Sequence, residues 1–484
     1  MAAGSYVGLD IGSKQIKVAE LRRSGQGYEV TALGAAPTPI EAYENSIIVD
    51  AQLLGQAVKT LLNRSGVRSR SCVSSVSSQS GVAIRIFDLP QMTPSEMAES
   101  MKWEVEKHVP FSASEVIMDY QQIDRADAPA DGQNVEVLLA VAQQELIDRH
   151  VEVLFAAGLK PVAIDIEPLA VGRSLLDMGP AENEAPGHTV AIVTIGAANT
   201  DISIFRDRVL AYSRTLPLAG DQLDRAISES MGIALDAAET LKCQSGEVIL
   251  GQTPQVTPDF GGAAGFGGAS GFVDFTAPQA APAPEPLVQT SSPSGRMPFD
   301  FSSPGEAPVP SAAAPVDLSA SADATPPAEA PATRPVESSG DSGFFAPEFP
   351  AQAPAPNLPA VTSGAADATK VHVFNAMAPV LSELAIEIRR SLDYYKSQHA
   401  DAQIDRLLLA GGSARLPNLP SYLETELGIP AQVAERSGRL EVNAKGAAPE
   451  SASDLTSVFP VCIGLAARDL LPDSGAGKGK ARKK

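Results

Sequence analysis

Two similar stretches decide the fold, VGLDIGSKQIKVAEL at residues 7–21 and VAIVTIGAANTDISIF at residues 190–205. Each stretch alternates apolar and polar residues in the rhythm of a strand, passes through a glycine turn and continues as a second strand. Superposing the two stretches places Gly12 on Gly196. Such self-similarity indicates an internal duplication. The sequence therefore predicts two similar domains that face each other.

The remaining secondary structure is predicted from periodicity and from capping residues. Asp50 caps one helix, and Thr93, Pro94 and Glu96 open another with a capping pattern. We expect helices at residues 50–62, 93–109, 143–157, 220–231, 234–245, about 375–398, about 417–427, and around PVCIGLAARDLL at 460–471. We expect strands within 5–35, at 82–88, 115–123, 134–142 and 162–166, within 188–216, and at RLLLAGG, 406–412.

The segment from 251 to 370 differs from the rest of the chain in composition. It is rich in Ala, Pro, Gly and Ser, as in APAPEP (281–286) and AQAPAPNLPA (351–360), and it shows neither a helical nor a strand period. Such a segment buries too little apolar surface to offset its chain entropy. We therefore expect a long disordered insertion, which costs the folded domains little because loop-closure entropy grows slowly with length.

Composition and charge limit the class of protein. The chain has 484 residues and a formal net charge of −21. Nucleic acid is therefore not expected as a partner, because phosphate binding needs clustered Lys and Arg. Three scattered cysteines, Cys72, Cys243 and Cys462, suit a reducing compartment. With no signal-peptide pattern and no run of roughly 20 apolar residues, we expect a cytoplasmic protein without a transmembrane segment.

The first glycine turn, DIGSKQIK at residues 10–17, has the composition of a phosphate-binding turn. Backbone N–H groups around such a turn bind anions, and Gly12 allows a close approach. Ser13 adds a hydroxyl, and Lys17 can neutralise phosphate charge. Asp10 is placed to hold Mg²⁺ through water, the usual way magnesium is bound beside phosphates. Taken alone, the same pattern also describes an ordinary hairpin with a polar turn.

Four motifs resemble the actin-like ATPase superfamily in their order: DIGSKQIK, IGAANTDI (195–202), AETLK (238–242) and LAGGSARLPNL (409–419). The resemblance implies that ATP and Mg²⁺ bind between two domains, with Asp10 at the metal. For Glu239 and Lys242, a solvated helix pair is the alternative. The implied nucleotide-binding residues are Asp10, Gly12, Ser13, Lys14, Lys17, Gly196, Ala197, Asn199, Thr200, Glu239, Lys242, Gly411, Gly412 and Ser413.

Within that superfamily, the segment 87–123, which contains WEVEKHVPF, resembles the family of the type IV pilus assembly protein PilM. The phrase EIRRSLDYYKSQ (387–398) resembles the same family, and the resemblance covers nearly all of 5–250 and 371–472. It implies an α/β, actin-like, duplicated ribonuclease-H-like two-domain fold with a small inserted α+β subdomain. The disordered insertion lies outside the resemblance.

The resemblance and the change in composition together predict how the chain is divided. The expected parts are the first domain at 1–84 and 161–187, the inserted subdomain at 85–160, the second domain at 188–250 and 371–472, the disordered insertion at 251–370, and a basic flexible tail at 473–484.

The PilM resemblance implies an ATP-binding cytoplasmic scaffold of type IV pilus biogenesis, held at the inner membrane through partners. The implied partners are a PilN-like membrane protein and other inner-membrane pilus assembly proteins. The PilN-like tail would lie in a groove between the first domain and the inserted subdomain, as peptide tails commonly do. Candidate lining residues are Phe87, Leu89, Trp103 and Phe111, with ordinary core packing as the alternative.

Two departures from the superfamily pattern argue for slow ATP turnover at most. The second phosphate turn has Thr194 where an acid is usual, and Ala219 stands where a second glycine is expected. Hydrolysis needs positioned charge and a positioned water, so binding survives these changes more easily than catalysis does.

Three other functions remain open. The first is an FtsA-like protein that forms filaments or tethers them to a membrane, although the basic end SGAGKGKARKK (474–484) lacks an apolar face. The second is the equivalent component of a related secretion or competence machine. The third, a true kinase, ranks last because no catalytic base is evident in a substrate cleft.

Overall fold

A computed structural model describes most of the two predicted domains. The described residues are 6–25, 27–44, 47–77, 81–109, 111–112, 114–123, 134–179, 187–251, 363–399, 402–435, 439–444 and 455–471. The expected disorder of the insertion concerns residues that lie almost entirely outside this part, and so does the expected basic tail. Both stay predictions.

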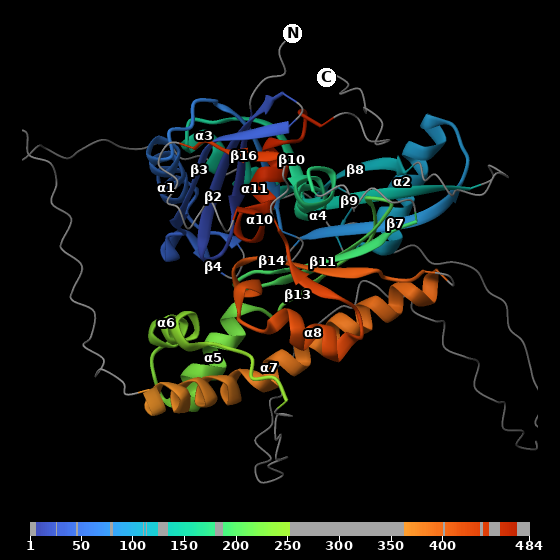
Figure 1. The fold of residues 1–484 in the computed structure, drawn as a ribbon. Helices are drawn as coiled ribbons and strands as arrows, with labels where there is room; N and C mark the ends of the chain where they lie inside the picture. Colours follow the sequence, from blue (N-terminus) through green and yellow to red (C-terminus); the bar gives the residue numbers. More distant parts are fainter. Residues whose placement is uncertain are drawn as a thin grey trace, which may run out of the picture. The chain divides into compact units, whose positions relative to one another are not determined.

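The first lobe is built on a six-stranded sheet (Figure 1). In spatial order its strands are β10 (Lys160–Ile166), β6 (Ser71–Val76), β1 (Val7–Ile11), β2 (Gln15–Ser24), β3 (Gly27–Pro37) and β16 (Leu440–Val442). Helices α1 (Ala51–Arg64) and α3 (Gln144–Ala156) bury one face of this sheet in a common core. As predicted, the Asp50 side chain caps α1 by accepting from the N–H groups of Gln52 and Leu53.

The other face of the first sheet is covered by the end of the chain. Helix α11 (Pro460–Ala466) packs on β1 and β2, and the short helix α10 (Leu455–Val458) precedes it. Gly8 is required here because a Cβ at that position would lie 1.9 Å from the carbonyl oxygen of Cys462. In Figure 1 these red helices lie beside the blue strands of the N-terminal half.

The second lobe repeats the sheet order of the first. Its strands, in spatial order, are β13 (Val209–Leu216), β12 (Thr200–Arg206), β11 (Thr189–Ile195), β14 (Arg406–Ala410) and β15 (Ala431–Val433). Strands β11 and β12 are antiparallel, and β11 and β14 are parallel, as β1 pairs with β2 and with β6. The predicted duplication is therefore confirmed in the topology.

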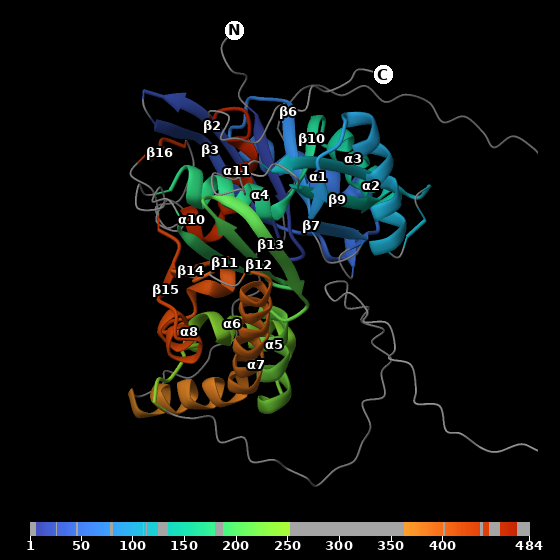
Figure 2. The same ribbon diagram turned by 90° about the vertical axis from the view of Figure 1, so that its right-hand side faces the viewer.

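Helices of the second lobe gather below its sheet (Figure 2). They are α5 (Gly220–Met231), α6 (Leu235–Ser245), α7 (Ser363–Gln398) and α8 (Leu419–Leu427). Helix α7 contains Pro379 and, over Asp367–Gln398, meets the length and apolarity of a membrane span. Half of its most apolar window is buried, and a core helix meets the same criterion. Its buried face, with Val373 and Met377, belongs to the core of the second lobe.

The inserted subdomain has a three-stranded sheet of β7 (Val82–Pro90), β9 (Asn134–Gln143) and β8 (Val116–Ile123). Helix α2 (Pro94–His108) lies on it and buries Met101 and Val105 against the central strand β9. The predicted capping box is confirmed, because Thr93 and Glu96 cap each other's backbone N–H groups.

One hydrophobic cluster joins both lobes and the subdomain. It contains Val73 of β6, Ile84 of β7, Leu138 of β9, Ile192 of β11 and Leu408 of β14. Since this cluster includes strands of both central sheets, the two lobes share a hydrophobic core. The short helix α4 (Glu167–Gly172), which begins where β10 ends, also contributes to this core.

Three predicted boundaries are corrected by the packing. Helix α3 belongs to the core of the first lobe, so the subdomain does not extend to 160. Strand β16 pairs with β3 and helix α11 packs on β1 and β2, so both belong to the first lobe and not to the second domain. Helix α7 begins at Ser363, within the expected insertion, and Lys370 in its early turns pairs with Glu247 beyond α6.

Candidate functional site

Both glycine turns close their hairpins in the same way. The N–H of Gly12 donates to the carbonyl oxygen of Gln15 at 3.0 Å, and the N–H of Gly196 donates to that of Asn199 at 2.8 Å. A Cβ on Gly12 would lie 3.0 Å from the first carbonyl, and one on Gly196 would lie 2.9 Å from the second. The two turns are therefore equivalent in structure, and each is crowded enough to favour glycine.

The turns face one cavity of about 370 Å³, a size common for small-molecule sites. Every nucleotide-binding residue expected from the sequence lines it except Thr200. Thr200 is fully buried in β12, where its hydroxyl donates to the carbonyl oxygen of Leu218. Lining residues that the sequence did not single out include Glu167, Asp201, Asp221, Asp224, Cys243 and Arg415.

Asp10 and Lys17 form the buried floor of the cavity. They are partners in the β1–β2 register, and Lys17 Nζ lies 3.2 Å from Asp10 Oδ2. Their side chains are only 10% and 19% exposed. Burial opposes the charge on Lys17, but the Asp10 carboxylate outweighs it and the pKa of Lys17 is raised. The Asp10 carboxylate therefore already pairs with a cation. A bound metal ion would have to share this carboxylate with Lys17.

Two further acids, the partly exposed Glu167 and the buried Asp201, lie beside this pair. Glu167 is the first residue of α4, and Asp201 is the register partner of Thr194 across β11 and β12. Burial raises the pKa of Glu167 well above its ordinary value, and the charges of Asp201 and Asp10 raise it further. Burial also raises the pKa of Asp201 to about 6, against a hydrogen bond from Thr215 that lowers it.

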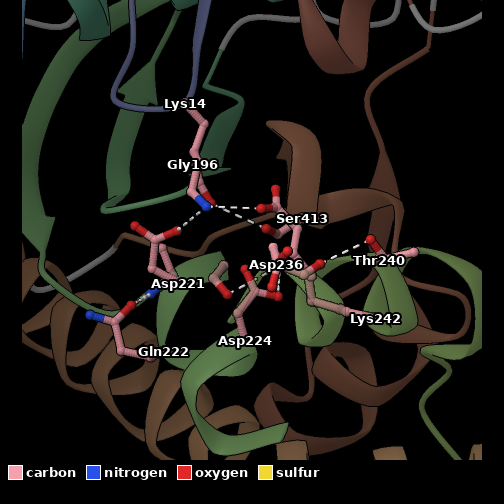
Figure 3. Close-up of polar contacts among 12 residues, drawn as sticks. Lys14, Gly196, Asp221, Gln222, Asp224, Asp236, Thr240, Lys242 and Ser413 are labelled. Carbon is pink, nitrogen blue, oxygen red and sulfur yellow. Dashed lines mark hydrogen bonds and ion pairs between the residues drawn. The ribbon is translucent and has the colours of Figure 1, made fainter. Parts of the chain in front are cut away.

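The rim of the cavity is bridged by an ion pair between the lobes (Figure 3). Lys14, in the first turn, donates to Glu239 Oε2 of α6 at 2.9 Å and lies 3.8 Å from Asp221 Oδ1 of α5. The side chains of Lys14 and Glu239 are 45% and 43% exposed. Burial lowers the pKa of Lys14, but its hydrogen bond and charge interaction with Glu239 outweigh burial and raise it.

The second-lobe wall is held together by polar contacts, several of which are visible in Figure 3. Lys242 of α6 lies 2.8 Å from Asp224 of α5 and donates to the carbonyl oxygen of Gly220 at 3.1 Å. Ser413 donates to the carbonyl oxygen of Gly196 at 3.1 Å. A Cβ on Gly220 would lie 2.7 Å from Ser413 Oγ, so this position favours glycine. The glycine that the superfamily pattern predicts at the position of Ala219 is thus found one residue later, at Gly220.

The residues of this cavity fit a nucleotide with magnesium. The two crowded glycine turns present backbone to the cavity, and Lys14, Lys17, Lys242 and Arg415 supply positive charge. Among the described residues, no group of three or more His, Cys, Asp or Glu could hold a metal by itself. Mg²⁺ keeps several waters and is usually held by one or two carboxylates together with phosphates, and the carboxylates of Asp10, Glu167 and Asp201 line this cavity.

The four residues proposed for the partner groove lie elsewhere. Phe87, Leu89 and Phe111 pack against the core of the subdomain, as the alternative interpretation expected. Trp103 is 61% exposed, and the ammonium of Lys107 lies 5.3 Å from its ring centre. None of the four lines the cavity described above or the one described next.

A second cavity, of about 420 Å³, lies in the first lobe where β9 of the subdomain leads into α3. Its apolar lining includes Ile47, Val49 and Leu146, and the first two side chains are exposed. Ser75 also lines it, and its buried hydroxyl has no hydrogen-bond partner within the described residues. The cavity therefore offers apolar surface together with an unsatisfied polar group.

His150 of α3 forms another part of this lining. Its Nε2 lies 2.8 Å from Ser74 Oγ, and that hydroxyl donates to the carbonyl oxygen of Leu9 at 2.7 Å. Because a hydroxyl has one proton to donate, Nε2 must carry the hydrogen of this bond. Burial lowers the pKa of His150 to about 4, so the ring is neutral at physiological pH.

Two family models match the chain. The model described as type IV pilus assembly protein PilM matches residues 8–248, and the model described as cell division protein FtsA matches residues 191–453. FtsA of Streptococcus pneumoniae is 24% identical over 266 residues, which are 50% of this chain and 56% of that protein. FtsA of Pseudomonas aeruginosa is 25% identical over 262 residues, 49% of this chain and 60% of that protein. The chain thus matches less than two thirds of these relatives.

A solved structure, the PilM-PilN type IV pilus biogenesis complex, is similar over nearly the whole fold. The TM-score is 0.64, with 23% sequence identity, and the match covers 96% of this chain and 99% of that one. At this level of identity the similarity concerns the fold, and it agrees with the two-lobed arrangement described above.

Proposed function

Because the chain belongs to the FtsA/PilM branch of the actin-like ATPase superfamily, with a PilM match over its first half, we propose that it is an ATP-binding scaffold of type IV pilus assembly. In this role it works in the cytoplasm and is held at the inner membrane by partners. The observation that carries the proposal is the single cavity on which both glycine turns converge.

Nucleotide would bind with its phosphates against the two turns. Lys17 and Asp10, which pair at the floor of the cavity, would contact the phosphates and the metal ion, and Gly411, Gly412 and Ser413 would pack against the nucleoside. Bound Mg-ATP would supply a metal and phosphates whose charges interact with Asp10, Glu167 and Asp201. We expect slow hydrolysis at most, below about 1 s⁻¹, the low end for enzymes.

Calorimetry with Mg-ATP and Mg-ADP tests this proposal, and Gly412→Phe is the informative variant. Gly412 lines the cavity, and a Cβ at this position meets nothing within 4 Å, so the backbone there has room for a side chain. We expect the parent protein to bind nucleotide and Gly412→Phe to lose binding while its melting temperature stays unchanged. Absence of binding in the parent protein would remove the nucleotide function.

We further propose that the second cavity receives the tail of a PilN-like membrane protein. Its support is the exposed apolar rim at Ile47 and Val49, with the unpartnered Ser75 hydroxyl inside as a ready contact for peptide backbone. This places the tail near the junction of the first lobe and the subdomain, as the sequence led us to expect, but not on the four aromatic and apolar residues named there.

Peptides from candidate membrane partners distinguish the two groove positions. Val49→Asp puts a charge on the exposed rim of the second cavity, and Trp103→Ala removes the exposed ring of the subdomain. We expect Val49→Asp to abolish peptide capture and Trp103→Ala to leave it intact. The opposite pattern would move the partner site to α2.

An FtsA-like filament protein is the second candidate, and the FtsA match over residues 191–453 favours it. Sedimentation and electron microscopy with Mg-ATP separate the candidates. A scaffold that binds one tail per copy stays small in the presence of nucleotide, whereas a filament-forming protein pellets and shows polymers.

A further inference from the structure

The rim and the floor of the nucleotide cavity use their lysines differently. Lys17 is buried at the floor beside Asp10, within one hairpin of the first lobe. Lys14 stands at the exposed rim, and both of its acidic partners, Glu239 and Asp221, come from helices of the second lobe. Lys14 therefore links the two lobes across the rim of the cavity, whereas Lys17 is paired within the first lobe.

Both ends of this link are anchored. The first turn is fixed by Thr38, whose N–H donates to the carbonyl oxygen of Lys14 at 3.0 Å and whose hydroxyl donates to that of Gly12 at 2.7 Å. Helix α6, which carries Glu239, is tied to α5 by the buried pair of Lys242 and Asp224. The two elements that carry the pair are therefore each held by contacts within their own lobe.

We propose that Lys14 is a latch across the cleft: its pairing with Glu239 and Asp221 favours the closed arrangement of the two lobes and slows nucleotide release. The proposal rests on the nucleotide function above. Domain closure around a ligand is a common mode of motion, and Lys14, Glu239 and Asp221 are not members of the hydrophobic core that the lobes share. A contact made only in the closed arrangement shifts the equilibrium toward it.

The expected effect is modest because the pair is partly exposed. Ion pairs of this kind contribute about 0.2–1 kcal/mol, which corresponds to about a 1.5- to 5-fold change in an equilibrium or rate. Salt screens such pairs. Release from the parent protein should therefore accelerate as salt is added, and release from a variant without the latch should accelerate less.

Stopped-flow release of a methylanthraniloyl-ATP probe with Mg²⁺, displaced by excess ATP, measures the latch. We expect Lys14→Met, which keeps the length of the side chain and removes its charge, to release the probe about 1.5 to 5 times faster. Lys14→Arg should keep slow release. The matched control is Lys59→Met, which removes the charge of an exposed lysine of α1 that does not line the cavity.

The charge exchange Lys14→Glu with Glu239→Lys separates a latch from a phosphate contact. A latch predicts fast release in Lys14→Glu alone and slower release again in the double variant. A phosphate contact predicts that the double variant binds the probe as poorly as Lys14→Glu, because its glutamate still repels phosphate, and this result overturns the proposal. Unchanged release in Lys14→Met also overturns it, with the nucleotide function intact. No probe binding in the parent protein overturns both.

Discussion

The two glycine turns share a backbone and differ in charge. In the first hairpin the register pair that faces the cavity is Asp10 with Lys17, and in the second it is Thr194 with Asp201. The acid thus lies on the first strand of one hairpin and on the second strand of the other. The two hairpins therefore have the same glycine turn, with its backbone at the cavity, but different side chains lining the cavity next to it.

This difference changes how the missing acid at 194 is interpreted. Asp201 lines the cavity and lies directly across from Thr194, so the second turn does have a carboxylate. Asp10 is compensated by Lys17, whereas the pKa of Asp201 is raised by burial and by Asp10. The first hairpin holds its acid as a charged pair, and the second holds an acid whose charge is opposed by its surroundings.

The largest expected effect comes from the first hairpin. Asp10→Ala should weaken Mg-ATP binding by about 1–3 kcal/mol, the range for a lost charge-assisted contact, or about 5- to 150-fold in affinity. Calorimetry with Mg²⁺ and with EDTA measures it, because a metal role predicts that the loss shrinks when magnesium is removed. An equal loss without magnesium would mean that Asp10 acts by positioning Lys17. If nucleotide orders the cleft, Asp10→Ala should also reduce partner capture.

The sequence could predict the two hairpins, but it could not predict which side chains face the cavity. Alternation and glycine turns are local signals, so β1, β2, β11 and β12 were foreseeable. The site role of Asp201 depends on strand register, and that of Glu167 depends on α4 starting at the cavity. Neither leaves a local pattern.

The elements missed by sequence reasoning were missed for the same reason. Strand β6, SCVSSV, looks polar, but Ser74 is satisfied inside the sheet by Leu9 and His150. Strand β16 has three residues and pairs with β3, which lies some 400 positions earlier in the chain. Helix α3 was correctly predicted as a helix, and only tertiary packing assigns it to the first lobe.

The second effect tests the uncompensated acid. The folded-state pKa of Asp201 is about 6, above the ordinary value of about 3.9, so the folded protein binds more protons between these values. Stability therefore falls as pH rises through this window and stays lower above it. Asp201→Asn removes this penalty, and Asn can still accept from Thr215.

Calorimetric melting at pH 7.5 and pH 5.5 measures this effect. Asp201→Asn should be more stable than the parent at pH 7.5, by on the order of 2 kcal/mol, and the gain should shrink at pH 5.5. Asp165→Asn is the matched control, because Asp165 is a buried acid paired with Arg173 at 2.7 Å. It should be destabilised at both pH values. If Asp201→Asn were less stable than the parent protein at pH 7.5, the charge of Asp201 would not be unfavourable in the folded protein, and the proposed difference between the two hairpins would be wrong.

The third effect comes from adding an acid to the second hairpin. Thr194→Asp would place a carboxylate directly across from Asp201, and like charges opposite each other in a sheet are destabilising, by up to about 1 kcal/mol. We expect a lower melting temperature that Mg-ATP partly restores. ATP turnover measured in the same variant shows whether the usual acid at this position raises hydrolysis. If Thr194→Asp had a higher melting temperature than the parent protein without nucleotide, Asp201 would not carry a charge opposite the new carboxylate.

The smallest effect is expected for Thr194→Ala, and it sharpens the comparison with Asp10→Ala. Thr194 contributes a neutral hydroxyl, so its removal takes no charge from the cavity, and the affinity for Mg-ATP should change by less than about twofold. Stability should fall by a few tenths of a kcal/mol, because alanine is less suited to a strand than threonine. We therefore expect Thr194→Ala to lower the melting temperature slightly and to leave the affinity for Mg-ATP nearly unchanged. If Thr194→Ala lost as much affinity as Asp10→Ala, the hydroxyl would be a direct ligand contact, and the two turns would be alike in function as well as in backbone.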